Sequence, residues 1–124
     1  MLANSPIAPT LPAADLKRAR NFYENKLGLK VMQATDQDVM YECGGGTMLY
    51  VWQREPSPTD HTEAAFKVDN IEQEVKELKE KGVEFESYDL PGLKTDEDNI
   101  ARIDGYKGAW FRDSEGNILS LTEM

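Results

Sequence analysis

Two kinds of hydrophobic periodicity alternate along this chain, and the alternation occurs twice. Apolar residues recur every three to four positions across residues 17–27 and again across residues 72–81, which predicts two amphipathic helices. Each stretch follows a residue type that caps helix N-termini and precedes a glycine, which often ends a helix in the left-handed conformation. These residues are Asp15 and Gly28 for the first helix, and Asp69 or Asn70 and Gly82 for the second.

Around each predicted helix the apolar period is two, as in half-buried strands. The pattern predicts one strand before each helix and three after it. The predicted strands span 7–13, 29–35, 39–43 and 47–54 in the first copy, and 63–68, 83–87, 107–112 and 118–123 in the second. The chain therefore repeats a βαβββ pattern at an offset of about 55 residues, which predicts the α+β class.

The repeat divides the chain into a first module of about 5–54 and a second of about 62–124, joined by a proline-containing linker over 55–61. A linker this short does not separate two free domains. Modules of roughly 60 residues are marginal alone, so we expect one domain over 1–124, with modules paired within the chain or across a dimer. Residues 88–106 interrupt the second module, and we interpret them as a lid over a cavity or as a solvated loop.

Charge and cysteine content exclude several classes of protein. The 124 residues carry 23 acidic and 14 basic side chains, a formal net charge of −9, which argues against nucleic-acid binding. A single cysteine, Cys43, excludes an intrachain disulfide, and we interpret it as a small core residue rather than a nucleophile. Residues 1–12 contain no basic region and no apolar run typical of a signal peptide, and no apolar run in the sequence has membrane-spanning length, so we expect a cytoplasmic protein without a membrane partner.

Five short motifs occur in order along the chain, at residues 11–16, 22–23, 27–29, 65–69 and 111–117. Together, in this order and spacing, they resemble those of the glyoxalase/bleomycin resistance/extradiol dioxygenase family, also called the vicinal oxygen chelate (VOC) superfamily. Ser114 stands where the last motif usually has proline. The resemblance implies that each βαβββ module forms half of a curved, half-barrel-like mixed sheet with helices on its outer face. It also implies a homodimer.

Metal-dependent members of this family hold a divalent ion with one residue on the first and one on the fourth strand of each module. The corresponding positions here are Ala8, Tyr50, Glu63 and Ser120, of which only Glu63 is a strong ligand type. We therefore predict no metal and no other cofactor. An alternative metal site would combine His61 and Glu63 with an acid from 96–98. Independently of a metal, Glu63 is a possible base or an anchor for a ligand amine if it faces the cleft, and a surface carboxylate if the strand register differs by one residue.

Strand alternation predicts which side chains line the cleft. The predicted ligand-binding residues combine large aromatic surfaces with hydroxyl groups and one carboxylate, a combination suited to stacking on and orienting a small molecule. Trp110 fits the core equally well, and the aromatic residues could instead fill the cleft themselves. The predicted set is Tyr50, Trp52, Glu63, Tyr106, Trp110 and Ser120.

The leading functional hypothesis is a metal-independent protein that binds a cationic or aromatic small molecule, as the resemblance to bleomycin-resistance-like proteins implies. The alternative is a lyase, isomerase or dioxygenase that holds a divalent metal with unusual ligands. A third hypothesis is a protein-interaction module.

Overall fold

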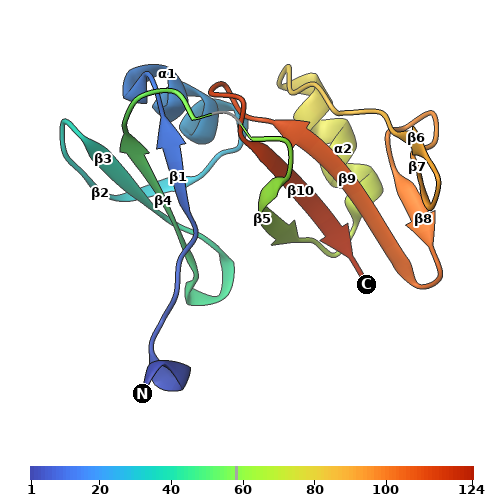
Figure 1. The fold of residues 1–124 in the computed structure, drawn as a ribbon, viewed down its shortest axis with the longest axis horizontal. Helices are drawn as coiled ribbons and strands as arrows, with labels where there is room; N and C mark the ends of the chain where they lie inside the picture. The colour runs from blue at the N-terminus through green and yellow to red at the C-terminus, as the bar shows by residue number, and fades with distance from the viewer. Residues whose placement is uncertain (58) are drawn as a thin grey trace. The chain divides into compact units, whose positions relative to one another are not determined.

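A four-stranded mixed sheet covered by one helical segment forms each half of the chain (Figure 1). The computed structural model describes residues 1–57 and 59–124, and two units separate after Ser57. The predicted linker 55–61 includes Pro58, which lies outside the described residues. The α+β class and the twofold repeat of one sheet topology are as the sequence predicts. Within the described residues no helix has the length and apolar character needed to cross a membrane.

The first unit consists of a short N-terminal segment followed by the predicted strand, helix and three strands. Its elements are η1 (Leu2–Asn4), β1 (Thr10–Ala13), α1 (Leu16–Asn21), η2 (Phe22–Lys26), β2 (Lys30–Ala34), β3 (Asp38–Glu42), η3 (Gly44–Gly46) and β4 (Met48–Gln53).

The strand order of this sheet is β1-β4-β3-β2. Strands β2, β3 and β4 form an antiparallel meander, which returns β4 to lie parallel to β1. The predicted first strand began at residue 7, but β1 begins at Thr10 and Ile7 is 91% exposed. Pro9 accepts a hydrogen bond from Tyr50 but has no N–H to donate, which explains why the ladder ends there.

The predicted first helix is α-helical only as far as Asn21 and continues as the π-helix η2. Asp15 caps it, as predicted, by accepting a hydrogen bond from the backbone N–H of Arg18 at 3.1 Å. The consecutive rings of Phe22 and Tyr23 are both buried and meet edge to face at 5.5 Å. The wider π turn thus accommodates two adjacent aromatic side chains in one core.

Alternating residues of β1, β3 and β4 face the helix and form the core of the first unit. Tyr41 is fully buried, and its hydroxyl donates to Glu24 Oε2 at 2.9 Å. Glu24 also accepts a hydrogen bond from Arg20 Nε at 2.7 Å, so the polar end of Tyr41 is satisfied at the edge of the core. The buried residues are Leu11, Ala13, Leu16, Ala19, Phe22, Tyr23, Val39, Tyr41, Leu49 and Val51.

The second unit has the same topology, with strand order β5-β10-β9-β8 and β5 parallel to β10. Its elements are β5 (Thr62–Lys67), α2 (Ile71–Glu80), β6 (Asp89–Leu90), β7 (Leu93–Lys94), β8 (Ala101–Ile103), β9 (Tyr106–Arg112) and β10 (Ile118–Glu123). Asn70 is the N-cap of α2 and accepts from the N–H of Gln73. Gly28 and Gly82 both adopt the predicted left-handed conformation, with φ of 73° and 88°.

The prediction of a strand over 83–87 is wrong, because no strand forms there. Only a single bridge joins Phe85 to Phe111 of β9, with a further hydrogen bond from Glu86 N to Trp110 O at 2.7 Å. The chain leaves this edge after a few residues, and β8 returns to pair with the other end of β9. The edge position that one strand fills in the first unit is therefore shared by two separate segments.

Residues 88–106, predicted to be a lid or an irregular loop, are largely folded. They contain the antiparallel pair β6–β7, a bridge between Thr95 and Ala101, and β8. Asp96 stabilises the turn between Thr95 and Ala101, because its carboxylate accepts hydrogen bonds from the N–H groups of Asp98 and Ile100. The first residue of the acidic run 96–98 therefore has a structural role.

A network of ion pairs connects the start of α2 to the sheet of the second unit. Glu72 Oε2 accepts from Arg102 at 2.7 Å and from Lys107 at 2.9 Å. Lys107 also lies 3.4 Å from Glu123, whose other carboxylate oxygen accepts from the N–H of Ile71. The Lys107 and Arg102 hydrogen bonds lower the pKa of Glu72 from its ordinary value of 4.5 to about 2.

This lowered pKa predicts an acid-sensitive contribution to stability. The folded state holds the Glu72 proton less tightly than the unfolded state, so the stabilisation is fully present above pH 4.5 and is lost as the pH falls toward about 2. We expect Glu72→Gln to flatten the decline of the urea midpoint between pH 5 and pH 3, roughly the accessible part of that window. Glu80→Gln, an equal loss of charge on the same helix, should leave the decline as steep as in the parent protein.

Candidate functional site

Each sheet has one face against its helix and an opposite face that carries half-exposed side chains. In the first unit, strand register aligns Thr10, Tyr50 and Met40 in one row across this opposite face. Pro12, Trp52 and Asp38 form the next row. The predicted ligand residues Tyr50 and Trp52 therefore lie on the face away from α1, two positions apart on β4.

Tyr50 and Asp38 form a short hydrogen-bonded pair on this face. The Tyr50 hydroxyl donates to Asp38 Oδ2 at 2.5 Å, and Thr35 Oγ1 donates to Asp38 Oδ1 at 2.6 Å. The Thr35 and Tyr50 bonds lower the pKa of Asp38, and the same pairing raises the pKa of Tyr50. Asp38 is therefore an ionised carboxylate at neutral pH, directly opposite an aromatic ring. Sequence reasoning missed it, although alternation along 38–42 places it on the same face.

The charged side chain of Arg54, which follows β4, covers one side of the Trp52 ring. The Arg54 guanidinium carbon lies 5.3 Å from the centroid of the Trp52 ring, within the range of a cation–π contact. The Trp52 side chain therefore lies in an environment that already accommodates a cation.

In the second unit, Ala65, Ser120 and Trp110 form a row across three strands on the face away from α2. Tyr106 and Trp110 flank Gly108 on β9, and a Cβ placed on Gly108 would lie 3.0 Å from both the Tyr106 hydroxyl and the Trp110 ring. The two aromatic side chains therefore converge over the glycine, which has no side chain to separate them. Of the predicted residues, Tyr106, Trp110 and Ser120 are thus brought together.

A third aromatic residue joins this cluster from the segment after α2. Tyr88 meets Trp110 edge to face, with ring centroids 5.5 Å apart, and burial raises the pKa of Tyr88. Trp110 remains half-buried, whereas Ser120 is only 3% exposed. Ser120, the register partner of Trp110, therefore offers almost no accessible surface to a ligand. Strand alternation did not identify Tyr88 as a ligand residue, because Tyr88 lies outside the predicted strands, at the start of segment 88–106.

Glu63 occupies an irregular position in β5. Thr62 pairs with Ile118 and Ala64 pairs with Leu119, so Glu63 is the additional residue of a β-bulge. A bulge changes the direction of a side chain relative to strict alternation, which is the premise that placed Glu63 in the cleft. Its carboxylate accepts a hydrogen bond from Thr59 Oγ1 at 2.6 Å.

The residues at the family's metal-ligand positions do not fit a divalent ion. Ala8 offers no donor, the Tyr50 hydroxyl is committed to Asp38, and Ser120 is buried. His61 is exposed, and its Nδ1 lies 3.3 Å from the carbonyl of Thr62. Over residues 1–57 and 59–124, no three His, Cys, Asp or Glu side chains come close enough together to hold a metal ion. The alternative grouping of His61 and Glu63 with an acid from 96–98 is therefore not formed.

Cys43 is half-exposed beside the glycine turn, and burial raises the pKa of its thiol. A raised pKa disfavours the thiolate, which is the nucleophilic form. Cys43 is therefore not the core residue that was predicted, although the raised pKa of its thiol argues against a nucleophile, as predicted.

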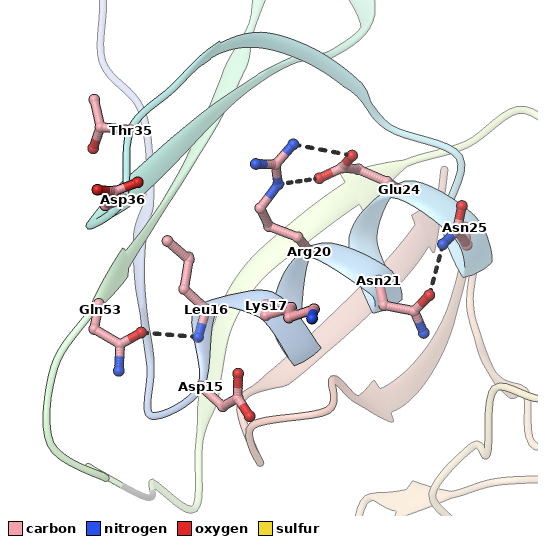
Figure 2. A pocket seen from close by; sticks show the side chains of 10 residues that line it. All are labelled: Asp15, Leu16, Lys17, Arg20, Asn21, Glu24, Asn25, Thr35, Asp36 and Gln53. Atoms are coloured by element: carbon pink, nitrogen blue, oxygen red, sulfur yellow. Dashed lines mark hydrogen bonds and ion pairs between the residues drawn. The ribbon is translucent and has the colours of Figure 1, made fainter.

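A separate polar pocket of about 520 Å³ lies on the helix side of the first unit (Figure 2). Gln53 stabilises the turn between β1 and α1 at the border of this pocket. Its side-chain amide accepts a hydrogen bond from Leu16 N at 2.9 Å and donates one to Ala14 O at 2.6 Å. None of the predicted ligand residues lines this pocket. It is lined by Asp15, Leu16, Lys17, Arg20, Asn21, Glu24, Asn25, Thr35, Asp36 and Gln53.

The second unit also contains pockets. One of about 480 Å³ runs along α2 beside Asp98 and Ile100. Another, of about 310 Å³, is lined by Tyr106 together with residues of the β8–β9 turn and Glu123. Tyr106 therefore connects the aromatic cluster to a concave part of the surface.

The two repeated sheets, each with a helix on one face and polar and aromatic residues on the other, define the class of protein. A model of the Glyoxalase/Bleomycin resistance protein/Dioxygenase superfamily matches residues 7–121, and the chain belongs to this superfamily. The resemblance inferred from the motifs is therefore confirmed. The chain matches no curated protein sequence.

Solved structures share the fold over nearly the whole chain. A glyoxalase family protein from Enterococcus faecalis is 26% identical, with a TM-score of 0.71 and coverage of 99% of this chain and 100% of that one. TnmS3, an antibiotic-binding protein from a Streptomyces species, is 18% identical, with a TM-score of 0.68 and coverage of 99% and 98%. The fosfomycin resistance protein FosX from Listeria monocytogenes is 15% identical, with a TM-score of 0.73 and coverage of 98% and 93%.

The convergence of two rings over Gly108 predicts the effect of adding a methyl group there. We expect Gly108→Ala to displace the ends of the Tyr106 and Trp110 side chains and to destabilise the fold by about 1 kcal/mol, the lower end of the cost of overpacking. Near-ultraviolet circular dichroism should change while the far-ultraviolet spectrum does not. Gly44→Ala is the matched control, since nothing lies within 4 Å of a Cβ at Gly44; an equal spectral change in both variants would contradict the proposed ring placement.

Proposed function

We propose that this protein binds a small aromatic or cationic molecule, without a resident metal, on the sheet faces that lie away from the helices. The observation that carries the proposal is the aromatic cluster Tyr88, Tyr106 and Trp110 around Gly108. Aromatic side chains left half-exposed on one face offer stacking area to a planar ligand. An antibiotic-binding protein and a fosfomycin resistance protein share the fold, which supports a small organic molecule as the ligand without specifying its charge or aromatic character.

The chemistry of the cluster favours recognition over reaction. Its three aromatic residues present ring faces and hydroxyl groups, and the small side chain of Ser120 lies beside Trp110 on the adjacent strand, where it leaves room for the indole. Such groups stack and hydrogen-bond, but they do not activate a nucleophile without a neighbouring base. We therefore assign Tyr106 and Trp110 to ligand contact and Ser120 to support of Trp110.

Residues of the first unit are the basis for proposing that the ligand is cationic. Tyr50, Trp52 and the ionised Asp38 combine aromatic surface with a negative charge. A ligand that is both aromatic and cationic suits this face. Glu63 remains a candidate anchor for a ligand amine or a base, with its carboxylate oriented by Thr59.

Metal independence is the second part of the proposal and rests on the donor set. The family's ligand positions provide Ala8, Tyr50, Glu63 and Ser120, and one carboxylate does not displace the water of a divalent ion at useful affinity. The competing hypothesis is an enzyme that holds a metal with Glu63 and His61. We also propose that the protein is a cytoplasmic homodimer, as the family resemblance implies.

Ligand binding at the aromatic cluster can be read from tryptophan fluorescence. The chain has two tryptophans, so Trp52→Phe leaves Trp110 as the sole indole. In that background we expect proflavine, a planar aromatic cation, to quench Trp110. Tyr106→Ala should weaken proflavine binding by about two- to tenfold, the equivalent of about 0.5–1.5 kcal/mol for a lost aromatic contact. Leu2→Ala, which removes an exposed apolar side chain at the N-terminus, should not; equal effects of both substitutions would refute binding at the cluster.

Metal content separates the binding protein from the enzyme. We expect the purified protein to contain no stoichiometric Zn²⁺, Ni²⁺, Mn²⁺ or Fe²⁺ after dialysis, and its melting temperature to be unchanged when these ions are added. Glu63→Gln should behave as the parent protein does in both measurements. A stoichiometric metal that is lost in Glu63→Gln would overturn metal independence and favour the enzyme.

A further inference from the structure

One face of the first unit brings together an aromatic ring, a carboxylate and a cation that do not form an ordinary ion pair. Trp52 on β4 is the direct register partner of Asp38 on β3. Arg54 follows the end of β4, and its guanidinium lies over the Trp52 ring at 5.3 Å. The three side chains therefore lie on two adjacent strand segments at one end of the sheet.

Asp38 has no counter-ion in the part of the chain that the structure describes. Its two carboxylate oxygens accept hydrogen bonds from Thr35 and Tyr50, both neutral donors, and no Lys, Arg or His nitrogen lies within the 4.0 Å of a salt bridge. These hydrogen bonds orient the carboxylate and favour its charged form. A half-buried carboxylate that is oriented but not neutralised attracts an external cation.

Arg54 is equally without a carboxylate partner among residues 1–57 and 59–124. Its side chain is exposed, and its guanidinium contacts the Trp52 ring rather than Asp38. The backbone N–H of Arg54 donates to Ala13 O at 3.0 Å, which holds the main chain in place beside β1. The side chain can therefore leave the ring without breaking an ion pair and without moving the strand.

We propose that Trp52 and Asp38 form a subsite for an organic cation of the guanidinium or quaternary ammonium type, and that the Arg54 side chain occupies this subsite in the free protein. The ligand cation takes the place of the guanidinium over Trp52 and gains the charge of Asp38 in addition. The Arg54 side chain thereby competes with the ligand cation for the face of Trp52. The inference rests on the proposed function, since it takes the face away from α1 to be a ligand surface.

The competition selects among ligands by charge. A neutral aromatic molecule that displaces Arg54 exchanges a cation–π contact for a stacking contact and gains nothing from Asp38. An organic cation replaces the lost contact with one of the same type and is also attracted by the carboxylate of Asp38, the register partner of Trp52. The geometry therefore favours cations over neutral aromatic compounds of equal size.

The test uses Trp110→Phe, in which Trp52 is the sole indole and reports directly on its own face. The probe is benzyltrimethylammonium, and benzyl alcohol is the uncharged aromatic comparison. Arg54→Gln removes the competing cation. Lys17→Gln is the matched control, because it changes the net charge equally at an exposed lysine on α1, which lies on the other side of the sheet.

We expect Arg54→Gln to tighten binding of benzyltrimethylammonium by about two- to fivefold, which is the usual strength of an exposed cation–π contact expressed as affinity. Lys17→Gln should change the affinity less, and its effect should disappear at high salt. Asp38→Asn should weaken binding of the cation while leaving benzyl alcohol unaffected. Thermal unfolding of each variant checks that the fold is intact.

The inference is overturned if Arg54→Gln weakens binding, if it has no more effect than Lys17→Gln, or if Trp52 responds to neither probe. Its failure is distinct from failure of the proposed function, which depends on the response of Trp110 to proflavine in the Trp52→Phe background. Binding at Trp110 without competition at Trp52 would leave a ligand-binding protein whose Arg54 has no part in selection.

Discussion

Parallel pairing of the first and fourth strands, β1 with β4 and β5 with β10, is the interaction on which each unit depends. In the strand order of the first unit, β1 and β2 lie at opposite edges, so the connection between them must cross one face of the sheet. The helical segment makes this crossing and covers that face. The meander that follows returns the fourth strand to the first. Among the residues that the structure describes, no helix covers the opposite face within its unit, and the candidate ligand residues lie there.

Alternation along these strands then determines which side chains are available for chemistry. On β4, Leu49 and Val51 are buried against the helix while Tyr50 and Trp52 are half-exposed on the other face. On β9 the same rule separates buried Phe111 from half-buried Trp110. The half-exposed residues Tyr50, Trp52 and Trp110 therefore do not belong to the hydrophobic cores. Their position follows from the period of two and from the presence of a helix on one face only.

The structure also explains why the second unit departs from the repeat. The ion pairs of Glu72 with Arg102 and Lys107 connect the start of α2 to β8 and β9. This arrangement requires β8 at the sheet edge, where the repeat predicted residues 83–87. The segment between them is displaced into the β6–β7 pair, and Tyr88 at its start reaches Trp110. An insertion into the repeat thus contributes an aromatic residue to the candidate site.

The sequence by itself determined the two helices with their caps at Asp15 and at Asp69 or Asn70, the strands of the first unit to within a few residues, the superfamily and the scarcity of metal ligands. These properties depend on local periodicity and on residue types, which are visible along the chain. Only the tertiary structure decided that Glu63 lies in a bulge, that Asp38 is the partner of Tyr50, that Arg54 covers Trp52 and that Tyr88 joins Trp110. Each of these depends on the register between strands or on contacts between segments remote in the sequence. The hydrophobic pattern is almost unchanged by a one-residue bulge, and it carries no information about which polar side chains meet across two strands.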